Sequence, residues 1–221
     1  MERKVRTYSK NELLVKERRR EIIFRCTKEF TKKGFDRTTM RDLAKAFNLS
    51  TGALYHYIGS KEDILLISLD YIAERAEAYV DSIKVLENEL TPSEALKVAI
   101  EKHIRYVDKH QDMVIFHDQV IANVSKSYRK VMLDTADRMI GLFLSLLKRG
   151  VEAGEFKVAN PELWAVHIFQ CGRSWATLRW YFQRRFSLEE YIKAHTEFVF
   201  ASIRKEGKLT IPEKQPATPL L

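Results

Sequence analysis

The sequence of 221 residues is poor in the residues that interrupt helices. It has five prolines and eight glycines, about half of the roughly 12% that these two residues contribute to an average protein. The first proline is Pro92. Because a proline inside a helix costs about 3 kcal/mol, this scarcity favours long helices, and we predict an all-α fold.

Other absences narrow the function. The only cysteines, Cys26 and Cys171, do not form a CxxC pair, so zinc and redox chemistry have no support. The longest nearly apolar run, Met139 to Leu147, has nine residues, whereas a membrane span needs about 20. A secretory signal, a GxGxxG motif, a P-loop and an HExxH motif are also missing. We therefore expect a reduced, cytoplasmic protein with no catalytic site, no metal and no membrane partner.

The positive charge of the chain is concentrated at its N-terminal end. Residues 1–61 hold 16 Lys and Arg against 7 Asp and Glu, whereas the remaining residues hold 22 against 23. The whole net charge of +8 therefore belongs to the first quarter of the chain. Such an imbalance indicates a module that binds a polyanion, although a solvated basic face is the alternative from charge alone.

The first sixty residues show the pattern of a helix-turn-helix. Helices are predicted at 11–33, from Thr39 to about residue 47, at 51–57, and from residue 61 onward. Gly34 and Asn48 suit left-handed positions after the first two helices. Thr39, Ser50 and Ser60 are suitable N-caps. Two short helices joined by residues 48–50 form the DNA-reading motif.

The outward face of the third predicted helix carries hydroxyls and rings rather than the Glu and Lys of a merely solvated helix. Hydroxyl groups and helix N-termini both bind phosphate oxygens. Together with the basic charge, this composition favours a DNA-binding surface over a structural scaffold. The predicted DNA-contacting residues are Thr39, Arg41, Ser50, Thr51, Gly52, Tyr55, His56, Tyr57 and Lys61.

Three stretches of this region, TTMRDLA from Thr38, NLSTGALY from Asn48 and SKEDIL from Ser60, resemble the TetR family of bacterial regulators. The sequence departs from the family pattern at Asn48, where glycine is usual, at Ala53, where a hydroxyl residue is common, and at residues 57–58, where His-Phe is frequent. The resemblance implies a homodimeric repressor that a small ligand, bound in the C-terminal domain, releases from its operator.

The remainder of the chain is helical throughout, and about nine helices are expected in all. Joints fall at 87–92, 111–112 and 125–126, and further helices begin after Asn160 and Ser187. We predict three regions: a helix-turn-helix DNA-binding domain at 1–61, a helical ligand-binding and dimerisation domain at 62–206, and a loose tail at 207–221.

Three histidines, His103, His110 and His117, are spaced seven residues apart. On one helix this spacing separates neighbouring rings by about 10.5 Å, which is too far for them to share a metal ion. We interpret them as helix-face or pocket-lining residues, and Cys26, which lies on an apolar stripe, as a buried core thiol.

Residues 167–182 place two Trp, one Tyr and two Phe on one predicted helix. Small residues four positions apart allow close helix contact, which leaves ordinary core packing and a dimer contact both open. In the resembled family the last two long helices form the dimer interface. The predicted interface residues are Gly172, Ala176, Trp180 and Phe198.

Apolar residues interspersed with arginines in the C-terminal part suit a ligand with a hydrophobic body and an anionic end. This part, especially residues 150–156 and 175–181, also resembles TetR-type regulators that respond to fatty acyl-coenzyme A. A fatty acyl-CoA or fatty acid, another hydrophobic effector, and no ligand at all stay open, and no cofactor is expected. The predicted ligand residues are His103, Phe116, Met139, Phe143, Arg173, Trp175 and Arg179.

The sequence thus predicts a regulator whose partners are double-stranded DNA, a small hydrophobic effector and a second copy of the chain. A nonspecific nucleic-acid-binding protein without a ligand and a helical enzyme are the alternatives. Selection of random duplexes distinguishes them, because a repressor enriches a palindrome, a nonspecific binder enriches nothing and an enzyme does not bind DNA.

Overall fold

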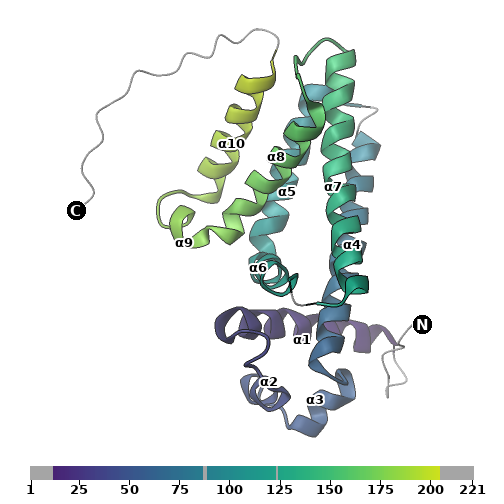
Figure 1. Cartoon of the computed structure of the whole chain (residues 1–221), viewed down its shortest axis with the longest axis vertical. Helices are drawn as coiled ribbons and strands as arrows, with labels where there is room; N and C mark the ends of the chain where they lie inside the picture. The colour runs from purple at the N-terminus through teal and green to yellow at the C-terminus, as the bar shows by residue number, and fades with distance from the viewer. Residues whose placement is uncertain (1–11, 87–88, 123, 205–221) are drawn as a thin grey trace, which may run out of the picture.

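The computed structural model of the chain (Figure 1) describes residues 12–86, 89–122 and 124–204. Over these residues it contains helices and no strand, as the all-α prediction requires. Ten helical segments are present, of which one has only four residues, so the expectation of about nine helices is also confirmed. They are α1 (Glu12–Lys33), α2 (Met40–Ala46), α3 (Thr51–Tyr57), α4 (Lys61–Leu86), α5 (Pro92–Lys109), α6 (Gln111–Val120), α7 (Lys126–Glu152), α8 (Pro161–Thr177), α9 (Arg179–Phe182) and α10 (Leu188–Ile203).

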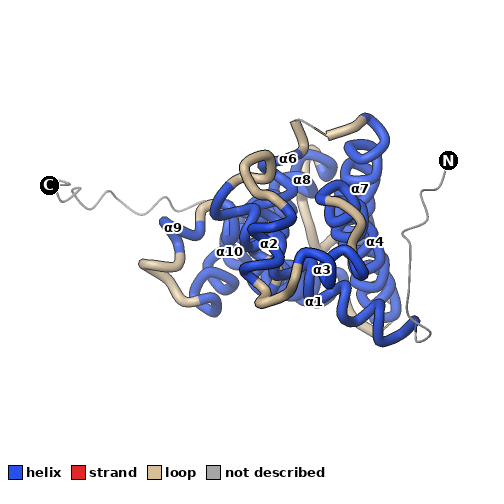
Figure 2. Tube along the Cα trace, turned by 90° about the horizontal axis from the view of Figure 1, so that it is seen from below, coloured by secondary structure: helices blue, strands red, loops and turns tan. Residues whose placement is uncertain are grey.

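The helices form two bundles that share α4. The head consists of α1, α2 and α3 at one end of the molecule (Figure 1), and Figure 2 views the chain from that end. The larger bundle places α4 and α7 on one side and α8 and α10 on the other. Because α4 runs unbroken from Lys61 to Leu86, the predicted boundary at residue 61 coincides with the start of the helix that joins the two parts.

The turns of the head form as their residues predict. Gly34 has φ +87° and Asn48 has φ +55°, so both occupy the left-handed region. After Gly34 the chain folds back, and the rings of Phe35 and Phe30 lie 5.0 Å apart. Ala44 of α2 is buried in the core of the head.

Side chains at the N-termini satisfy backbone N–H groups that a helix leaves unpaired. Thr39 accepts from the N–H of Asp42, and Ser50 accepts from the N–H of Ala53 at 3.0 Å. Asp42 completes a capping box, and the hydrogen bonds that it accepts from Thr39 lower the pKa of its carboxyl. The same type of cap starts the helices of the larger bundle, through Thr91, Ser125, Asn160 and Ser187.

The prediction of one aromatic helix over residues 167–182 is wrong. The helix ends at Thr177, Leu178 adopts φ −111° and ψ 28°, and a separate short turn, α9, follows. The change of direction brings the ring of Phe182 back to within 4.9 Å of the ring of Tyr191 on α10. The periodicity of the segment is helical throughout, but packing of α9 against α10 breaks the helix at Leu178.

Two further expectations concern burial and membranes. The side chain of Cys26 is fully buried in the head, and this burial raises the pKa of its thiol. Among the described residues, each helix is too short or too polar to cross a membrane. The predicted tail at 207–221 lies outside the described residues.

Candidate DNA-binding head and ligand cavity

The predicted recognition surface is the outward face of α3 together with the start of α2, in the head at one end of the molecule (Figure 1). Tyr55 of α3 exposes 48% of its surface. The predicted DNA-contacting residues all lie on the surface of the head. Thr39, Arg41, Ser50, Gly52, Tyr55 and His56 are exposed, and Thr51, Tyr57 and Lys61 are partly exposed.

Two arginines of α1, which the sequence did not single out, hold α2 and α3 in place. The Nε of Arg19 donates to the carbonyl of Tyr57 at 3.0 Å, at the end of α3. The Nη2 of Arg25 donates to the carbonyl of Ala46 at 3.1 Å, at the end of α2. The basic charge of α1 thus binds the carbonyl ends of both short helices, where the helix dipole is negative.

Gly52 has space around it. A methyl group at this position would meet only the Oγ of Ser50, at 4.0 Å. Packing within the head therefore does not require glycine here. An approaching DNA backbone does favour it, since the backbone of α3 can then come closer to a phosphate.

Lys61 is bonded within the head and is not a free cation on its surface. Its Nζ donates to the carbonyls of Phe35 at 2.9 Å and Asp36 at 3.4 Å, and it lies 4.7 Å from the centre of the Phe35 ring. This ammonium group closes the turn between α1 and α2 against the start of α4. The contact of Lys61 with DNA stays a prediction. The structure shows in addition that Lys61 stabilises the turn between α1 and α2.

This difference predicts distinct phenotypes for two substitutions. Tyr55→Ala is expected to weaken DNA binding about tenfold while changing stability by no more than about 0.5 kcal/mol, as for other surface changes. Lys61→Ala is expected to weaken binding and also to lower stability by about 1–2 kcal/mol, because two hydrogen bonds are lost. Urea denaturation and fluorescence titration of duplex DNA measure the two effects, and unchanged affinity in both variants contradicts the proposed surface.

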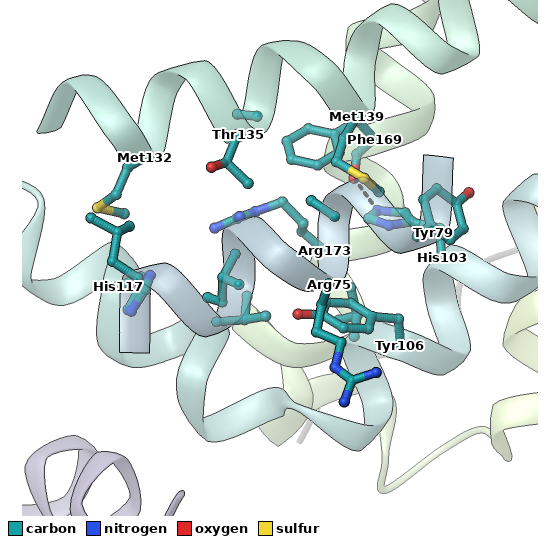
Figure 3. A pocket seen from close by; sticks show the side chains of 16 residues that line it. Arg75, Tyr79, His103, Tyr106, His117, Met132, Thr135, Met139, Phe169 and Arg173 are labelled. Carbon is teal, nitrogen blue, oxygen red and sulfur yellow. Dashed lines mark hydrogen bonds between the residues drawn. The ribbon is translucent and has the colours of Figure 1, made fainter. Parts of the chain in front are cut away.

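An apolar cavity lies inside the larger bundle, between α4, α5, α6, α7 and α8 (Figure 3). It contains about 690 Å³ of space free of atoms, a figure that includes the open solvent at its mouth. Most of the wall is apolar. The lining residues are Leu69, Ile72, Arg75, Ala76, Tyr79, His103, Tyr106, Val107, Val114, His117, Met132, Thr135, Ala136, Met139, Phe169 and Arg173.

Three of the seven predicted ligand residues, His103, Met139 and Arg173, line this cavity. Four others lie outside its wall because they have contacts elsewhere. Phe116 is stacked on Phe30 in the head, and Phe143 is buried behind the ring of His103. The Nε1 of Trp175 donates to Asp108 at 2.7 Å, and Arg179 forms an ion pair of 2.9 Å with Asp112.

His103 is held flat against α8. Its Nε2 lies 3.1 Å from the carbonyl oxygen of Phe169, and the two rings stack with their centres 5.3 Å apart. A Cβ atom at Gly172 would lie 2.4 Å from the Cδ2 of His103. Gly172 therefore provides the space for this ring, and burial lowers the pKa of His103 to about 4.

The two arginines of the cavity wall differ in whether they are already paired with an acidic side chain. Arg173 hydrogen-bonds to Asp118 and lies over the ring of Phe169. Arg75 makes no ion pair within the described part of the chain and stacks on Tyr71, with its guanidinium carbon 5.3 Å from the ring centre. Arg75 and Tyr106 do not stand out in the sequence, because one exposed arginine and one tyrosine on amphipathic helices carry no distinguishing signal.

Helix α6 connects the cavity to the head. Its Val114 and His117 line the cavity, while Phe116 packs on the head, where its ring lies 5.1 Å from that of Phe30. The Oγ1 of Thr31 on α1 also donates to the carbonyl of Asp112 at 3.1 Å. The two faces of one short helix are therefore shared between the two bundles.

The predicted interface residues divide into two pairs. Gly172 and Ala176 are buried within a single chain, where Gly172 makes room for His103 of α5, and their predicted contact with a second chain stays a prediction. Trp180 and Phe198 expose 64% and 60% of their surface. Other exposed apolar side chains of α8 and the α8–α10 turn are Leu163, Val166, Leu178, Tyr181 and Phe186.

The three histidines at 103, 110 and 117 lie in different surroundings. His103 and His117 line the cavity, whereas His110 stacks on Phe24, with ring centres 5.4 Å apart. The described residues contain no cluster of three or more His, Cys, Asp or Glu side chains that could hold an ion.

Comparison with known proteins adds to this geometry. Residues 26–66 match the family described as "Bacterial regulatory proteins, tetR family", and residues 89–203 match "Tetracyclin repressor-like, C-terminal domain". The HTH-type transcriptional regulator HbdR of Aromatoleum sp. (strain CIB) is 28% identical over 180 residues, which cover 81% of this chain and 78% of HbdR. The HTH-type transcriptional repressor KstR2 of Mycobacterium tuberculosis is 26% identical, over 87% of this chain and 96% of KstR2.

Solved structures agree in fold. The ketosteroid transcriptional regulator KstR2 of Mycobacterium tuberculosis superimposes with a TM-score of 0.72 at 21% identity, over 92% of this chain and 100% of that chain. AibR in complex with isovaleryl coenzyme A and operator DNA superimposes with a TM-score of 0.70 at 19% identity, over 83% and 98%.

Proposed function

The chain belongs to the TetR family of bacterial transcriptional regulators, whose members bind DNA and are not enzymes, and we propose that it is a homodimeric repressor whose operator binding is relieved by a hydrophobic effector. The main support for a response to an effector is the position of α6. This helix contributes Val114 and His117 to the cavity and Phe116 to the core of the head.

Binding to DNA requires two heads. A single α3 presents few side chains to a major groove, whereas a twofold dimer presents two copies one helical turn or more apart, and its operator is then a palindrome. The exposed apolar side chains of α8 and α10, including Leu163, Val166 and Phe198, support a dimer through these two helices.

Release follows from a change in the separation of the two heads. A ligand in the cavity presses on Val114 and His117, and α6 transmits the displacement through Phe116 and Phe30 to α1. A small tilt of α1 moves α3 further, because α3 lies at the far end of the head (Figure 1). The ligand stabilises the conformation that does not fit two successive grooves, and affinity for the operator falls.

The wall of the cavity supports an acyl thioester as the effector. The apolar lining, with Leu69, Ile72 and Met139, accommodates an acyl group, and Arg75 offers a cation to an anionic group. Guanidinium groups bind phosphates through paired hydrogen bonds. Isovaleryl coenzyme A in the complex of AibR, which has the same fold, supports the same class of ligand.

Two measurements test this proposal. Selection from random duplexes is expected to enrich a palindrome, and about four phosphate contacts per subunit give a log–log salt slope near −7. Acyl-coenzyme A species of graded chain length are then added to the complex. At 100 times the Kd the effector is expected to stabilise the protein by about 2.7 kcal/mol and to release the duplex.

Each part of the proposal can fail separately. Binding without sequence preference would support the nonspecific nucleic-acid-binding alternative. A palindrome that no acyl-coenzyme A releases would leave a repressor of this family with a different hydrophobic effector. Free coenzyme A is the control, since it carries the phosphates without the acyl group and is expected to leave the complex intact.

A further inference from the structure

Two polar groups in the wall of the cavity have no hydrogen-bond partner in the described part of the chain. They are the Nδ1 of His103 and the hydroxyl of Tyr106, and both atoms are buried. The two residues are one turn apart on α5 and both line the cavity (Figure 3). Buried polar groups are nearly always paired, and an unpaired one costs about 1–3 kcal/mol.

His103 offers an acceptor. Its Nε2 lies 3.1 Å from the carbonyl oxygen of Phe169, and a carbonyl can only accept, so Nε2 carries the proton and Nδ1 has a free lone pair. The side chain is 3% exposed, and burial lowers its pKa to about 4, which keeps the ring neutral near pH 7. Only a donor can satisfy Nδ1 in this state.

Tyr106 offers a hydroxyl. In Figure 3 its ring lies beside Arg75, and the hydroxyl is directed toward the middle of the lining side chains. Burial raises the pKa of the phenol, so the group stays protonated and can donate or accept.

The other neutral polar side chains of the wall each make at least one hydrogen bond. The hydroxyl of Tyr79 donates to the carbonyl of Ala99 at 2.7 Å, and that of Thr135 donates to the carbonyl of Val131 at 2.8 Å. The Nε2 of His117 lies 3.0 Å from the Oγ of Ser68. Among the described lining residues, the polar atoms that are both buried and unpaired are therefore those of His103 and Tyr106, on one face of α5.

We propose that the effector carries a hydroxyl group on the part that the cavity encloses, and that this group donates to the Nδ1 of His103 and hydrogen-bonds to Tyr106. The inference rests on the proposed function, because it takes the cavity as the effector site. A hydroxyl is the smallest group that has both a donor and an acceptor. A saturated acyl chain would leave both protein groups unpaired and exclude water from them, so a site of this kind discriminates against it.

The test uses two probes of similar shape, 2-naphthol and 2-methylnaphthalene, which differ in the hydroxyl. Their affinities are measured by NMR titration of the full chain labelled with ¹⁵N at histidine. We expect 2-naphthol to bind at least about tenfold more tightly, which corresponds to about 1.4 kcal/mol. Only 2-naphthol is expected to shift the Nδ1 resonance of His103, since hydrogen bonding changes the shielding of that nitrogen.

A matched pair of variants locates the effect. Tyr106→Phe removes an unpaired hydroxyl, so it is expected to reduce the preference for 2-naphthol several-fold and leave the stability of the free protein unchanged or raised. Tyr79→Phe removes a hydroxyl of the same cavity that is already bonded to Ala99. It is expected to leave the preference intact and to lower stability.

Equal affinity for the two probes, binding of neither, or an undiminished preference in Tyr106→Phe would overturn the inference. A separate arm compares decanoyl- and 3-hydroxydecanoyl-coenzyme A for release of the operator. If neither compound releases it, the acyl-coenzyme A assignment fails, while the result with the naphthalene probes still decides whether the cavity recognises a hydroxyl.

Discussion

Replacing Gly150 with alanine is expected to destabilise the protein by about 3 kcal/mol. A Cβ atom at this position of α7 would lie 1.9 Å from the Cδ2 of Phe156, whose ring is buried beneath it. The loop cannot easily move away, because the N–H groups of Glu155 and Phe156 donate to the carbonyl of Gly150 at 2.9 and 3.0 Å. Overpacking costs about 1–3 kcal/mol, and expelling a buried phenylalanine from a core costs about 3–5 kcal/mol.

Gly141 provides the control on the same helix. It is exposed, and a Cβ atom there would meet nothing within 4 Å. Gly141→Ala is therefore expected to gain up to about 1 kcal/mol from helix propensity. Urea denaturation at one fixed protein concentration measures both variants. If Gly150→Ala is as stable as Gly141→Ala, the ring of Phe156 does not cover Gly150.

Placing aspartate at Phe198 is expected to convert the proposed dimer to a monomer. The side chain is 60% exposed on α10 of a single chain, so folding of one chain depends little on it. At an interface through α8 and α10 the new carboxylate would be buried without a partner, which costs several kcal/mol. Losing one of two linked heads is then expected to weaken operator binding at least 100-fold.

Val85 is the matched control, because its side chain is apolar and 69% exposed on α4, a helix whose main contacts are with α7, α1 and α5. Val85→Asp is expected to remain dimeric and to bind the operator normally. Light scattering gives the oligomeric state, and a duplex titration gives the affinity. A Phe198→Asp chain that stays dimeric, together with a dimeric Leu163→Asp chain, would place the interface elsewhere on the molecule.

The amino-acid sequence alone determined most of the head. Its turns depend on local features that are visible in sequence, namely a left-handed residue at Gly34 and Asn48 and capping side chains at Thr39 and Ser50. Such interactions join residues a few positions apart, so their geometry does not depend on the rest of the fold. For the same reason the starts of α5, α8 and α10 fell where the sequence predicted them.

Only the tertiary structure decided which neighbours the side chains of the larger bundle contact. The position of Gly172 in the sequence indicates close helix contact, and only the fold shows that the space beside it is filled by His103, 69 positions earlier in the sequence. Phe116 and Trp175 are predicted to line the pocket. In the fold Phe116 packs on Phe30 at the junction with the head, and Trp175 donates a hydrogen bond to Asp108. Periodicity states that a residue is on the apolar face of its helix, and it does not state which of several neighbouring helices that face meets. That choice depends on how α4 to α8 pack together, and it brings Arg75 and Tyr106 to the same cavity.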